Sequence, residues 1–428
     1  MSVEPQEDQL DALLTVDEVL QHILSRISAL PAEEVPTPQA LGRTLAEDIV
    51  ASTTVPPFAN SSMDGYAVRA ADVATASPES PARLPVVMDI PAGATPGHAV
   101  GPREAARIMT GAPMPQGADA VIPVEQTDDH WTSGGDTPLP EQVTVYRAAR
   151  PWQHVRPAGE DVRAGQTILR ASTALRPQDI GLLVSSGRVQ VPVYRQPRVA
   201  VLATGDELID LDEPLTPGKI RDSNSYVLAG LISSYGGVPI RLPVARDTLD
   251  DVRRRFAEAL SRQPDLIVSS AGVSVGTRDV VRTVVDELGH VDLWRVNLRP
   301  GKPLAFGHVR DIPFFGLPGN PVSAMVTFDV FVRPALLKQT GSDPHAVEMA
   351  TAVLAEDIQS DGRRTYLRVR LSRESDDLVA RTTGTQSSGA LLSMVLADGL
   401  LIIPEGVKEA PAGSRYPVRL LRSVNQPR

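Results

Sequence analysis

Three stretches between residues 198 and 335 place residue types that bind anions and metals directly after an apolar run. The apolar runs cover 199–202, 266–268 and 313–315, and the loops after them cover 203–207, 269–276 and 316–323. The loops are rich in glycine, serine and threonine, and Asp206, Glu207 and Asp279 lie in or beside them. Strands that alternate with helices predict a parallel sheet, whose ligands lie at the carboxyl ends of the strands. The pattern predicts an enzyme site for an anionic, phosphorylated ligand with a metal nearby.

The loop over 316–323 is the most specific of the three. Asn320 and Pro321 predict the start of a helix, and the free N–H groups and positive dipole end of a helix start favour an anion. Gly319 allows the backbone to approach a ligand closely, and Ser323 adds a hydroxyl group. An ordinary Asn-Pro helix start is the alternative, and the two similar loops beside it favour ligand binding.

The loop Thr204-Gly205-Asp206-Glu207 follows a run that reads as a buried strand. Adjacent carboxylates at a strand end can coordinate Mg²⁺ and connect it to a phosphate group. Asp247 and Asp279 are candidates for neighbouring strand ends and would complete a carboxylate cluster. The alternative interpretation is a solvated turn in which the aspartate caps a helix.

A basic cluster follows at Arg295, Arg299 and Lys302, in the segment Arg-Val-Asn-Leu-Arg-Pro-Gly-Lys-Pro. Guanidinium groups bind oxyanions with two parallel hydrogen bonds, and a lysine adds a point charge. A solvated basic edge strand is the alternative. The seven histidines show no ligand spacing, so a metal site built from histidine is not expected.

Two segments of the first 150 residues are less specific. Asp64 lies in Pro-Phe-Ala-Asn-Ser-Ser-Met-Asp-Gly-Tyr-Ala, where a metal ligand, a base and a simple Asx-turn are equally good interpretations. Thr110 lies in Met-Thr-Gly-Ala-Pro, whose pattern alone predicts only a β-hairpin.

Composition narrows the class of protein. The absence of cysteine excludes disulfides, thiolate metal sites and a cysteine nucleophile. A net charge of −10 argues against bulk nucleic-acid binding, which usually needs a basic face. Residues 1–14 are acidic without an apolar core, and no run approaches 18 apolar residues, so we expect neither a secretory signal nor a membrane span. A cytoplasmic location is the expectation.

Periodicity divides the 428 residues into parts of different character. We expect helices over 15–30, 177–186, 223–235, 249–260, 277–288 and 321–338, and a short helix or a helix-to-strand segment over 41–50. We expect strands over 84–90, 120–124 and 142–146, and, after residue 341, over 365–371, 378–383, 399–403 and 416–421. These elements predict a small β-rich module, an α/β unit over about 190–338, and a C-terminal β-barrel or sandwich.

Eight segments, in order along nearly the whole chain, resemble the molybdopterin molybdenumtransferase family, which includes bacterial MoeA and the gephyrin E-domain. The segments are PPFANSSMDGYAVR, RIMTGAPMPQGADAVIPVEQ, VRPAGEDVRAGQTIL, LATGDEL, GKIRDSNSYVLAGLI, SSAGVSVGTRDVV, LRPGKPLAFG and GLPGNPVSAMVTFDVFVRPAL. The resemblance implies insertion of molybdate into adenylylated molybdopterin, with Mg²⁺ assisting, release of AMP and formation of molybdenum cofactor.

The resemblance also implies an elongated homodimer of four-part subunits. The implied parts are a discontinuous N-terminal α/β domain over 10–50 and 151–188, an inserted β-rich module over 51–150, a molybdopterin-binding α/β domain with a three-layer parallel sheet over 189–340, and a C-terminal β-barrel over 341–428. The cleft would lie between the α/β domain of one subunit and the β parts of the other.

Matching the motifs residue by residue implies roles for particular side chains. Asp64, Thr110 and Asp161 would face the cleft from the partner, while Glu207, Asp247 and Asp279 would contact metal and nucleotide. Lys302 and Ser323 would contact the pterin phosphate and molybdate, and Arg363 and Ser388 would reach the oxyanion. The remaining implied substrate contacts are Thr204, Gly205, Ser270, Gly272, Ser274, Gly276, Arg299, Pro300, Gly319 and Asn320.

Three motifs depart from the family pattern. The usual Lys-Pro-Gly-Lys is here Arg299-Pro300-Gly301-Lys302, the usual Gly-Gly is Ala271-Gly272, and Thr277 and Arg278 precede Asp279. These changes keep a second hypothesis open, in which the chain is a gephyrin-like scaffold that binds a linear peptide of another protein beside its C-terminal β part. A generic nucleotide-binding α/β protein is a third, weaker interpretation.

Overall fold

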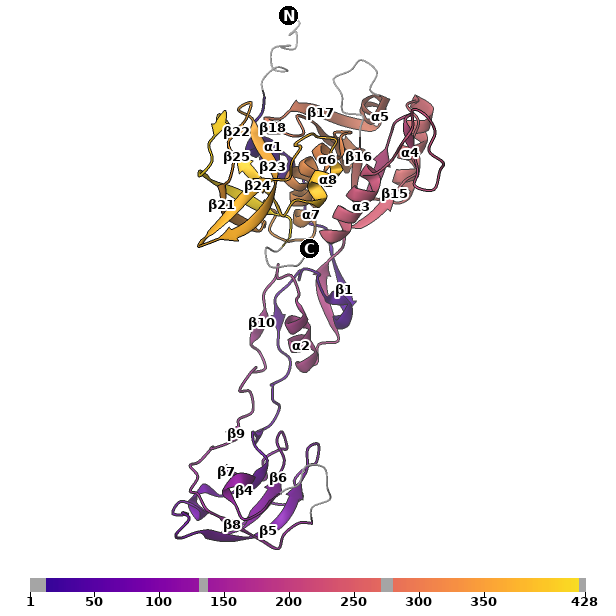
Figure 1. Cartoon of the computed structure of the whole chain (residues 1–428). Coiled ribbons are helices and arrows are strands. Elements are labelled where there is room, and N and C mark those ends of the chain that lie inside the picture. Colours follow the sequence, from indigo (N-terminus) through magenta and orange to yellow (C-terminus); the bar gives the residue numbers. More distant parts are fainter. Residues whose placement is uncertain (1–12, 131–137, 271–279, 423–428) are drawn as a thin grey trace, which may run out of the picture.

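The computed structural model describes residues 13–130, 138–270 and 280–422, with only the backbone of Leu293. Figure 1 shows an elongated molecule in which a β-rich module lies at one end and the α/β part and a β-barrel lie together at the other. Two chain segments connect the two ends, and a smaller part carrying β1, β10 and α2 lies between them.

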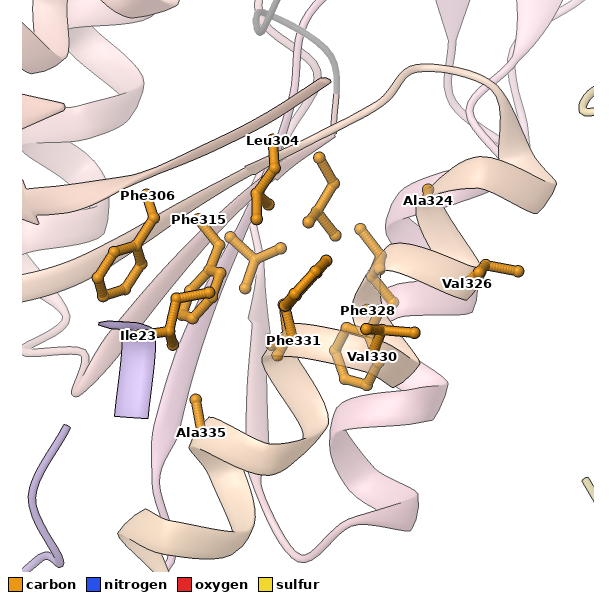
Figure 2. Packing of buried hydrophobic residues seen from close by; sticks show 14 of the residues in the cluster. Ile23, Leu304, Phe306, Phe315, Ala324, Val326, Phe328, Val330, Phe331 and Ala335 are labelled. Atoms are coloured by element: carbon orange, nitrogen blue, oxygen red, sulfur yellow. The ribbon is translucent and has the colours of Figure 1, made fainter. Parts of the chain in front are cut away.

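The helix at the N-terminus begins as the sequence predicts. In α1 (Val16–Ser25) Thr15 accepts a hydrogen bond from the Glu18 backbone, and the Glu18 side chain accepts one from Thr15, which forms a capping box. The helix ends at Ser25, earlier than predicted. Its apolar face packs on the large sheet of the α/β part, with Ile23 close to Phe306 and Phe315 (Figure 2).

The small part between the two ends is built from two strand pairs and one helix. The strand β1 (Ala32–Pro36) pairs with β11 (Gln190–Tyr194), and β2 (Ile49–Val50) pairs with β10 (Thr167–Leu169). The helix α2 (Pro177–Ser185) follows β10 and precedes β11 in the sequence. The helix considered for 41–50 is wrong. Gly42 takes a positive φ of 75° and Leu45 pairs with Val193, so tertiary pairing overrides the local apolar pattern.

Two segments running side by side form a neck between this part and the β-rich module. Val55 pairs with Val162, and β3 (Asn60–Ser61) pairs with β9 (Val155–Arg156). The module holds a five-stranded sheet in the order β7-β4-β6-β5-β8. Its strands are β4 (Gly65–Val68), β5 (Ala82–Ile90), β6 (Ala105–Ile108), β7 (Ala120–Pro123) and β8 (Gln142–Val145). The three strands predicted here are confirmed as β5, β7 and β8.

Both faces of this sheet are covered, since Tyr66 packs in one apolar cluster and Ala67 in another. Gly65 allows β4 to lie close to β7, because a Cβ at that position would fall 1.9 Å from the Ile122 carbonyl oxygen.

The α/β part is a three-layer structure around a six-stranded sheet in the order β15-β12-β16-β20-β19-β17. Its strands are β12 (Arg198–Ala203), β15 (Val238–Arg241), β16 (Leu266–Ser270), β17 (Gly289–Arg295), β19 (Pro303–Val309) and β20 (Ile312–Leu317). The sheet is mixed, which corrects the expected parallel sheet: β15, β12, β16 and β20 are parallel, while β19 and β17 run antiparallel to their neighbours. The chain after α5 returns as an antiparallel meander.

Alternate residues of each inner strand face opposite layers. Val199 and Val201 pack against the layer of α1, α3 (Asn224–Ser234), α6 (Pro321–Thr327) and α7 (Arg333–Gln339), whereas Ala200 and Leu202 face α4 (Leu249–Ser261) and α5 (Val280–Leu288). A π-helical segment, Phe328–Val332, joins α6 to α7. Figure 2 shows Phe328, Val330 and Phe331 of this segment among the buried residues on the α1 side. The predicted helices of this part are confirmed over their described residues.

The C-terminal strands close into a barrel, as predicted. The ring β23-β24-β21-β27-β25 is closed by pairing of β25 with β23. The strands are β21 (Met349–Leu354), β23 (Arg364–Glu374), β24 (Asp377–Thr382), β25 (Gly399–Ile403) and β27 (Arg415–Leu420), with α8 (Leu391–Val395) and the pair β22 (Ile358–Gln359) and β26 (Glu409–Ala410) beside them. The short strand β18 (Leu298–Arg299) of the α/β part pairs in parallel with β23, and β13 (Leu208–Ile209) pairs with β14 (Ile220–Arg221).

A buried charge cluster joins the barrel to the α/β part. The carboxylate of Asp329, in the π-helical segment, forms ion pairs with Arg333 at 3.1 Å and with Arg419 of β27 at 2.5 Å, and each of the three residues' side chains is at most 14% exposed. The Arg419 guanidinium lies 5.9 Å from the ring centroid of Tyr366 on β23. Among the described residues, no helix is both long and apolar enough to cross a membrane.

Candidate functional site

An open pocket of about 830 Å³ lies where the barrel meets the α/β part. The turn after β18, the loop before α6, the strand β23 and the loop around 386–388 contribute its walls. Of the residues predicted from sequence, the pocket brings together Arg299, Pro300, Lys302, Gly319, Asn320, Ser323, Arg363 and Ser388. The pocket therefore collects residues that are up to 89 positions apart in sequence, from Arg299 to Ser388.

The start of α6 forms one wall of the pocket. Asn320 is the N-cap residue and Pro321 follows as the first helical residue, as the sequence predicts. Ser323 is 4% exposed, and the Val322 N–H donates to the Ser388 carbonyl at 3.0 Å, which ties the helix start to the barrel loop. Gly301 lets the opposite turn approach this helix, since a Cβ there would lie 2.5 Å from the Thr327 hydroxyl oxygen and its φ is 112°.

Four cationic side chains line the pocket, and they differ in their partners. Arg363 donates to Asp361 through Nε at 3.0 Å and Nη2 at 2.5 Å, and also to the Leu298 carbonyl. Arg299 lies 3.6 Å from the same Asp361 oxygen. The bond from Arg363 is the main cause that lowers the pKa of Asp361 from its usual value, so this carboxylate is ionised at neutral pH. Lys302 is exposed in the pocket.

The fourth cation, Arg368, is a site residue that the sequence analysis missed. It is 1% exposed, and its donors reach the Ser393 hydroxyl at 3.1 Å and the Ser387 carbonyl at 3.0 Å. The structure records no ion pair between Arg368 and a described carboxylate. Burial, with a smaller contribution from Arg299, lowers the pKa of Arg368 to about 10, so it is still charged at neutral pH. A buried guanidinium without a counter-ion is suited to bind an oxyanion.

The strand ends of the α/β sheet form a second group of predicted residues. Thr204 and Ser270 are buried at the ends of β12 and β16. Asn224, at the start of α3, donates to the Ser270 hydroxyl and to the Gly319 carbonyl, both at 2.7 Å. Asn224 therefore links this group to the loop before α6, and the sequence analysis did not identify it.

The carboxylates of this group lie at the same edge of the sheet. The Asp206 N–H donates to an Asp247 oxygen at 3.4 Å and the Asp247 N–H to an Asp206 oxygen at 3.3 Å, so the two loops cap each other. Glu207 follows directly and its carboxylate lies against Gly205. Gly272, Ser274, Gly276 and Asp279 lie outside the described residues, as do the departures at Ala271, Thr277 and Arg278.

These oxygen ligands fit the donor set that Mg²⁺ prefers, in which one or two carboxylates are completed by substrate phosphates and water. Within the ranges that the structure describes, no group of three or more histidine or carboxylate side chains is placed to hold a metal ion. Glu207 and Asp247 are the described candidates for the metal and nucleotide end of the site.

Three further predicted residues belong neither to the pocket nor to the group at the strand ends. Asp64 accepts hydrogen bonds from the Thr110 N–H at 2.6 Å and from its hydroxyl at 2.7 Å, so these two residues form a pair. They lie directly before β4 and after β6, elements that Figure 1 places at the end of the molecule opposite the barrel. Asp161 is exposed in the neck, where its N–H donates to the Val55 carbonyl.

The fold and the pocket define an α/β protein with an attached β-barrel, whose shared pocket is lined by four cationic side chains. Three family models cover most of the chain: the MoeA N-terminal region (domains I and II) matches residues 14–187, a probable molybdopterin binding domain matches 200–338, and the MoeA C-terminal region (domain IV) matches 351–421.

Named relatives agree with these models. The chain is 38% identical to molybdopterin molybdenumtransferase 2 of Mycobacterium tuberculosis (strain H37Rv), over 90% of this chain and 94% of that protein. It is 35% identical to the molybdopterin molybdenumtransferase of Bacillus subtilis, over 96% and 95% of the two chains. A crystal structure of the molybdopterin biosynthesis MoeA protein from Pyrococcus horikoshii superposes with a TM-score of 0.81 at 34% identity, covering 96% of this chain and all of that one. The chain belongs to the molybdopterin molybdenumtransferase family.

Proposed function

We propose that this protein inserts molybdate into adenylylated molybdopterin and releases AMP, as a step of molybdenum cofactor biosynthesis. The observation that carries the proposal is Arg368, a buried guanidinium without a carboxylate partner among the described residues, in a pocket with Lys302 and the start of α6. Molybdate is a tetrahedral dianion, and guanidinium, ammonium, hydroxyl and helix N–H groups are the donors that such an anion needs. Ser323 and Ser388 supply hydroxyl groups at the same walls.

The two groups of residues fit two ends of one extended substrate. The pocket would hold molybdate and the pterin phosphate, with Arg299, Pro300, Gly319, Asn320 and Arg363 as further contacts. The strand ends at Thr204, Gly205 and Ser270 would hold the nucleotide, and Asn224 connects the two ends through its bonds to Ser270 and Gly319. The reaction needs stabilisation of the charge on the departing AMP more than a strong nucleophile in the protein.

Glu207 and Asp247, with Asp279, would hold Mg²⁺ at the nucleotide end. When bound, the ion would neutralise charge that develops on the phosphate groups. The reciprocal bonds between Asp206 and Asp247 fix the two loops that carry Glu207 and Asp247.

We also propose that a second copy of the chain completes the site. Asp64 and Thr110 are held together by two hydrogen bonds but lie at the far end of their own subunit from the pocket. An antiparallel arrangement of two elongated subunits would bring the module of one, with Asp161 of its neck, to the pocket of the other. The four-part division of the chain and the cytoplasmic location stay predictions.

The test is AMP release from adenylylated molybdopterin after addition of molybdate and Mg²⁺ to the purified protein. Wild type should release AMP, whereas Asp64→Ala should not. A mixture of Asp64→Ala and Lys302→Ala subunits should regain part of the activity, because one of the two sites in a mixed dimer would contain both native residues. Absence of AMP release by well-folded wild type would contradict the proposal.

The scaffold hypothesis receives no support from the comparisons, in which the named relatives are molybdenumtransferases. The altered position Arg299 lies inside the pocket with its charge retained, so this departure does not remove the oxyanion site. A scaffold that lost the chemistry would have no need to keep Arg368 buried without a counter-ion.

A further inference from the structure

We propose that Asp361 lowers the affinity of this pocket for free oxyanions, by pairing with two of its arginines so that an unanchored dianion such as sulfate, phosphate or molybdate binds weakly. The inference rests on the proposed function and adds a residue that would tune it.

The geometry makes Asp361 a shared partner of two pocket-lining cations. One of its oxygens accepts from Arg363 through Nε at 3.0 Å and Nη2 at 2.5 Å, and the same oxygen lies 3.6 Å from Arg299 Nη1. The other oxygen accepts from the Arg363 backbone N–H at 3.2 Å. The backbone of its own turn therefore holds the Asp361 carboxylate. That carboxylate is hydrogen-bonded to the guanidinium of Arg363 and forms an ion pair with the guanidinium of Arg299.

These contacts divide the cations of the pocket into two kinds. Arg368 is buried and Lys302 is exposed, and neither has a recorded ion pair with a described carboxylate. Arg299 and Arg363 already have one, so an incoming anion gains from them only by competing with Asp361. A charge-assisted hydrogen bond to a carboxylate is about as strong as one to another oxyanion, which makes this competition nearly balanced.

The consequence is a pocket in which Arg368 and Lys302 are available to bind an oxyanion, while Arg299 and Arg363 are already paired with Asp361. A small dianion that needs all four cations for tight binding would be disfavoured. A substrate anchored elsewhere, such as the adenylylated pterin, can displace Asp361 with its phosphate, because its binding at the strand ends contributes to the exchange.

The chain offers a matched control. Asp357 lines the same pocket and is exposed, but its oxygen accepts from the Ala412 N–H at 2.7 Å, and no arginine is recorded as its partner among the described residues. The substitutions Asp361→Asn and Asp357→Asn each remove one negative charge near the pocket. Only the first removes the carboxylate that holds Arg299 and Arg363.

The experiment is calorimetric titration of the full-length protein with sodium sulfate, sodium phosphate and sodium molybdate at constant ionic strength. We expect Asp361→Asn to bind sulfate and phosphate roughly tenfold more tightly than wild type, which corresponds to one charge-assisted contact regained. Asp357→Asn should tighten binding by less than Asp361→Asn does, since it removes a negative charge from the pocket wall but releases no arginine. In the AMP-release assay, sulfate should inhibit Asp361→Asn at correspondingly lower concentration.

Unchanged sulfate affinity in Asp361→Asn, or equal tightening in both variants, would overturn the inference. If Asp361→Asn fails to fold, Asp361→Ser keeps a polar residue in the turn and is titrated in the same way. The titration contains no pterin, so it is read independently of the proposed function: loss of the transferase proposal would show as absent AMP release, whatever the sulfate affinity.

Discussion

Replacement of Asp329 by asparagine tests how the barrel is held against the α/β part. The carboxylate of Asp329 lies between Arg333 at 3.1 Å and Arg419 at 2.5 Å, with only 10% of its side chain exposed. Asparagine keeps the shape and one acceptor oxygen but leaves two guanidinium groups buried without a counter-ion. Removing one partner of a buried ion pair costs about 3–5 kcal/mol, mostly because the other charge stays buried.

The hydrogen bonds that remain after the substitution determine where in that range the expected loss of stability falls. Arg333 and Arg419 still donate to the Asp329 carbonyl, at 3.2 and 3.1 Å, and Arg333 also donates to the Ala346 carbonyl at 2.5 Å. These bonds place the expected loss of stability for Asp329→Asn near the lower end, at about 3 kcal/mol. Arg419→Met should cost less, about 1–2 kcal/mol, because Asp329 then keeps Arg333 as its partner.

The assay is urea unfolding of both variants, with hydrogen exchange measured by mass spectrometry to locate the effect. Peptides of β23 and β27 should lose protection in Asp329→Asn, while those of β4 to β8 should keep it. The reasoning would be refuted by an Asp329→Asn protein as stable as wild type. It would equally be refuted if Arg419→Met were the more destabilised of the two, since that order cannot follow from an uncompensated buried charge.

Three further outcomes are expected. Arg368→Met should weaken binding of molybdate or sulfate to the pocket at least about tenfold, because the buried donor is lost; calorimetric titration checks this, and wild-type affinity would contradict the role given to this residue. Hydrogen bonding from Tyr226, more than the adjacent Arg241, lowers the pKa of Asp210 from 3.8 to about 2, so this group stabilises the folded protein above pH 4 and loses its effect as the pH falls towards 2. Tyr226→Phe should lose part of this stabilisation; the difference in unfolding free energy between wild type and variant should disappear near pH 2, and a difference that persists there would have another cause. Gly65→Ala should break the β4–β7 pairing, since the new Cβ would fall 1.9 Å from the Ile122 oxygen; hydrogen exchange should then rise in the β-rich module alone, and unchanged exchange would show that the strands can separate without loss.

Local sequence signals were sufficient where local physics decides the structure. The capping box at Thr15, the Asn320-Pro321 helix start and the strand–loop–helix repeats were all readable, because each depends on neighbouring residues. The pocket residues on loops after strands and before helices followed from the same signals. The barrel was readable from the return of period-two alternation after residue 341.

The remaining features depend on tertiary packing. Arg368 lies on β23, which is buried on both faces: Leu367 and Val369 face the barrel core, while Tyr366 packs with the α/β core. Arg368 is buried only because the barrel packs against the α/β part. The sequence pattern around Arg368 does not predict that packing. Arg368 is one of four arginines on this strand, and no local signal distinguishes it from the other three. The path of 41–50 was likewise decided by partners distant in sequence, since Leu45 pairs with Val193.

The neck is a narrow connection, so a small bend there would move the far end of the β-rich module over a large distance. Two segments with few backbone pairings carry the whole β-rich module, so bending is concentrated at this short connection. A rotation of a few degrees there is magnified with distance and becomes a large displacement at the loops that carry Asp64 and Thr110. In the dimer proposed above, such a rotation would move Asp64 and Thr110 relative to the partner's pocket without a rearrangement of either core.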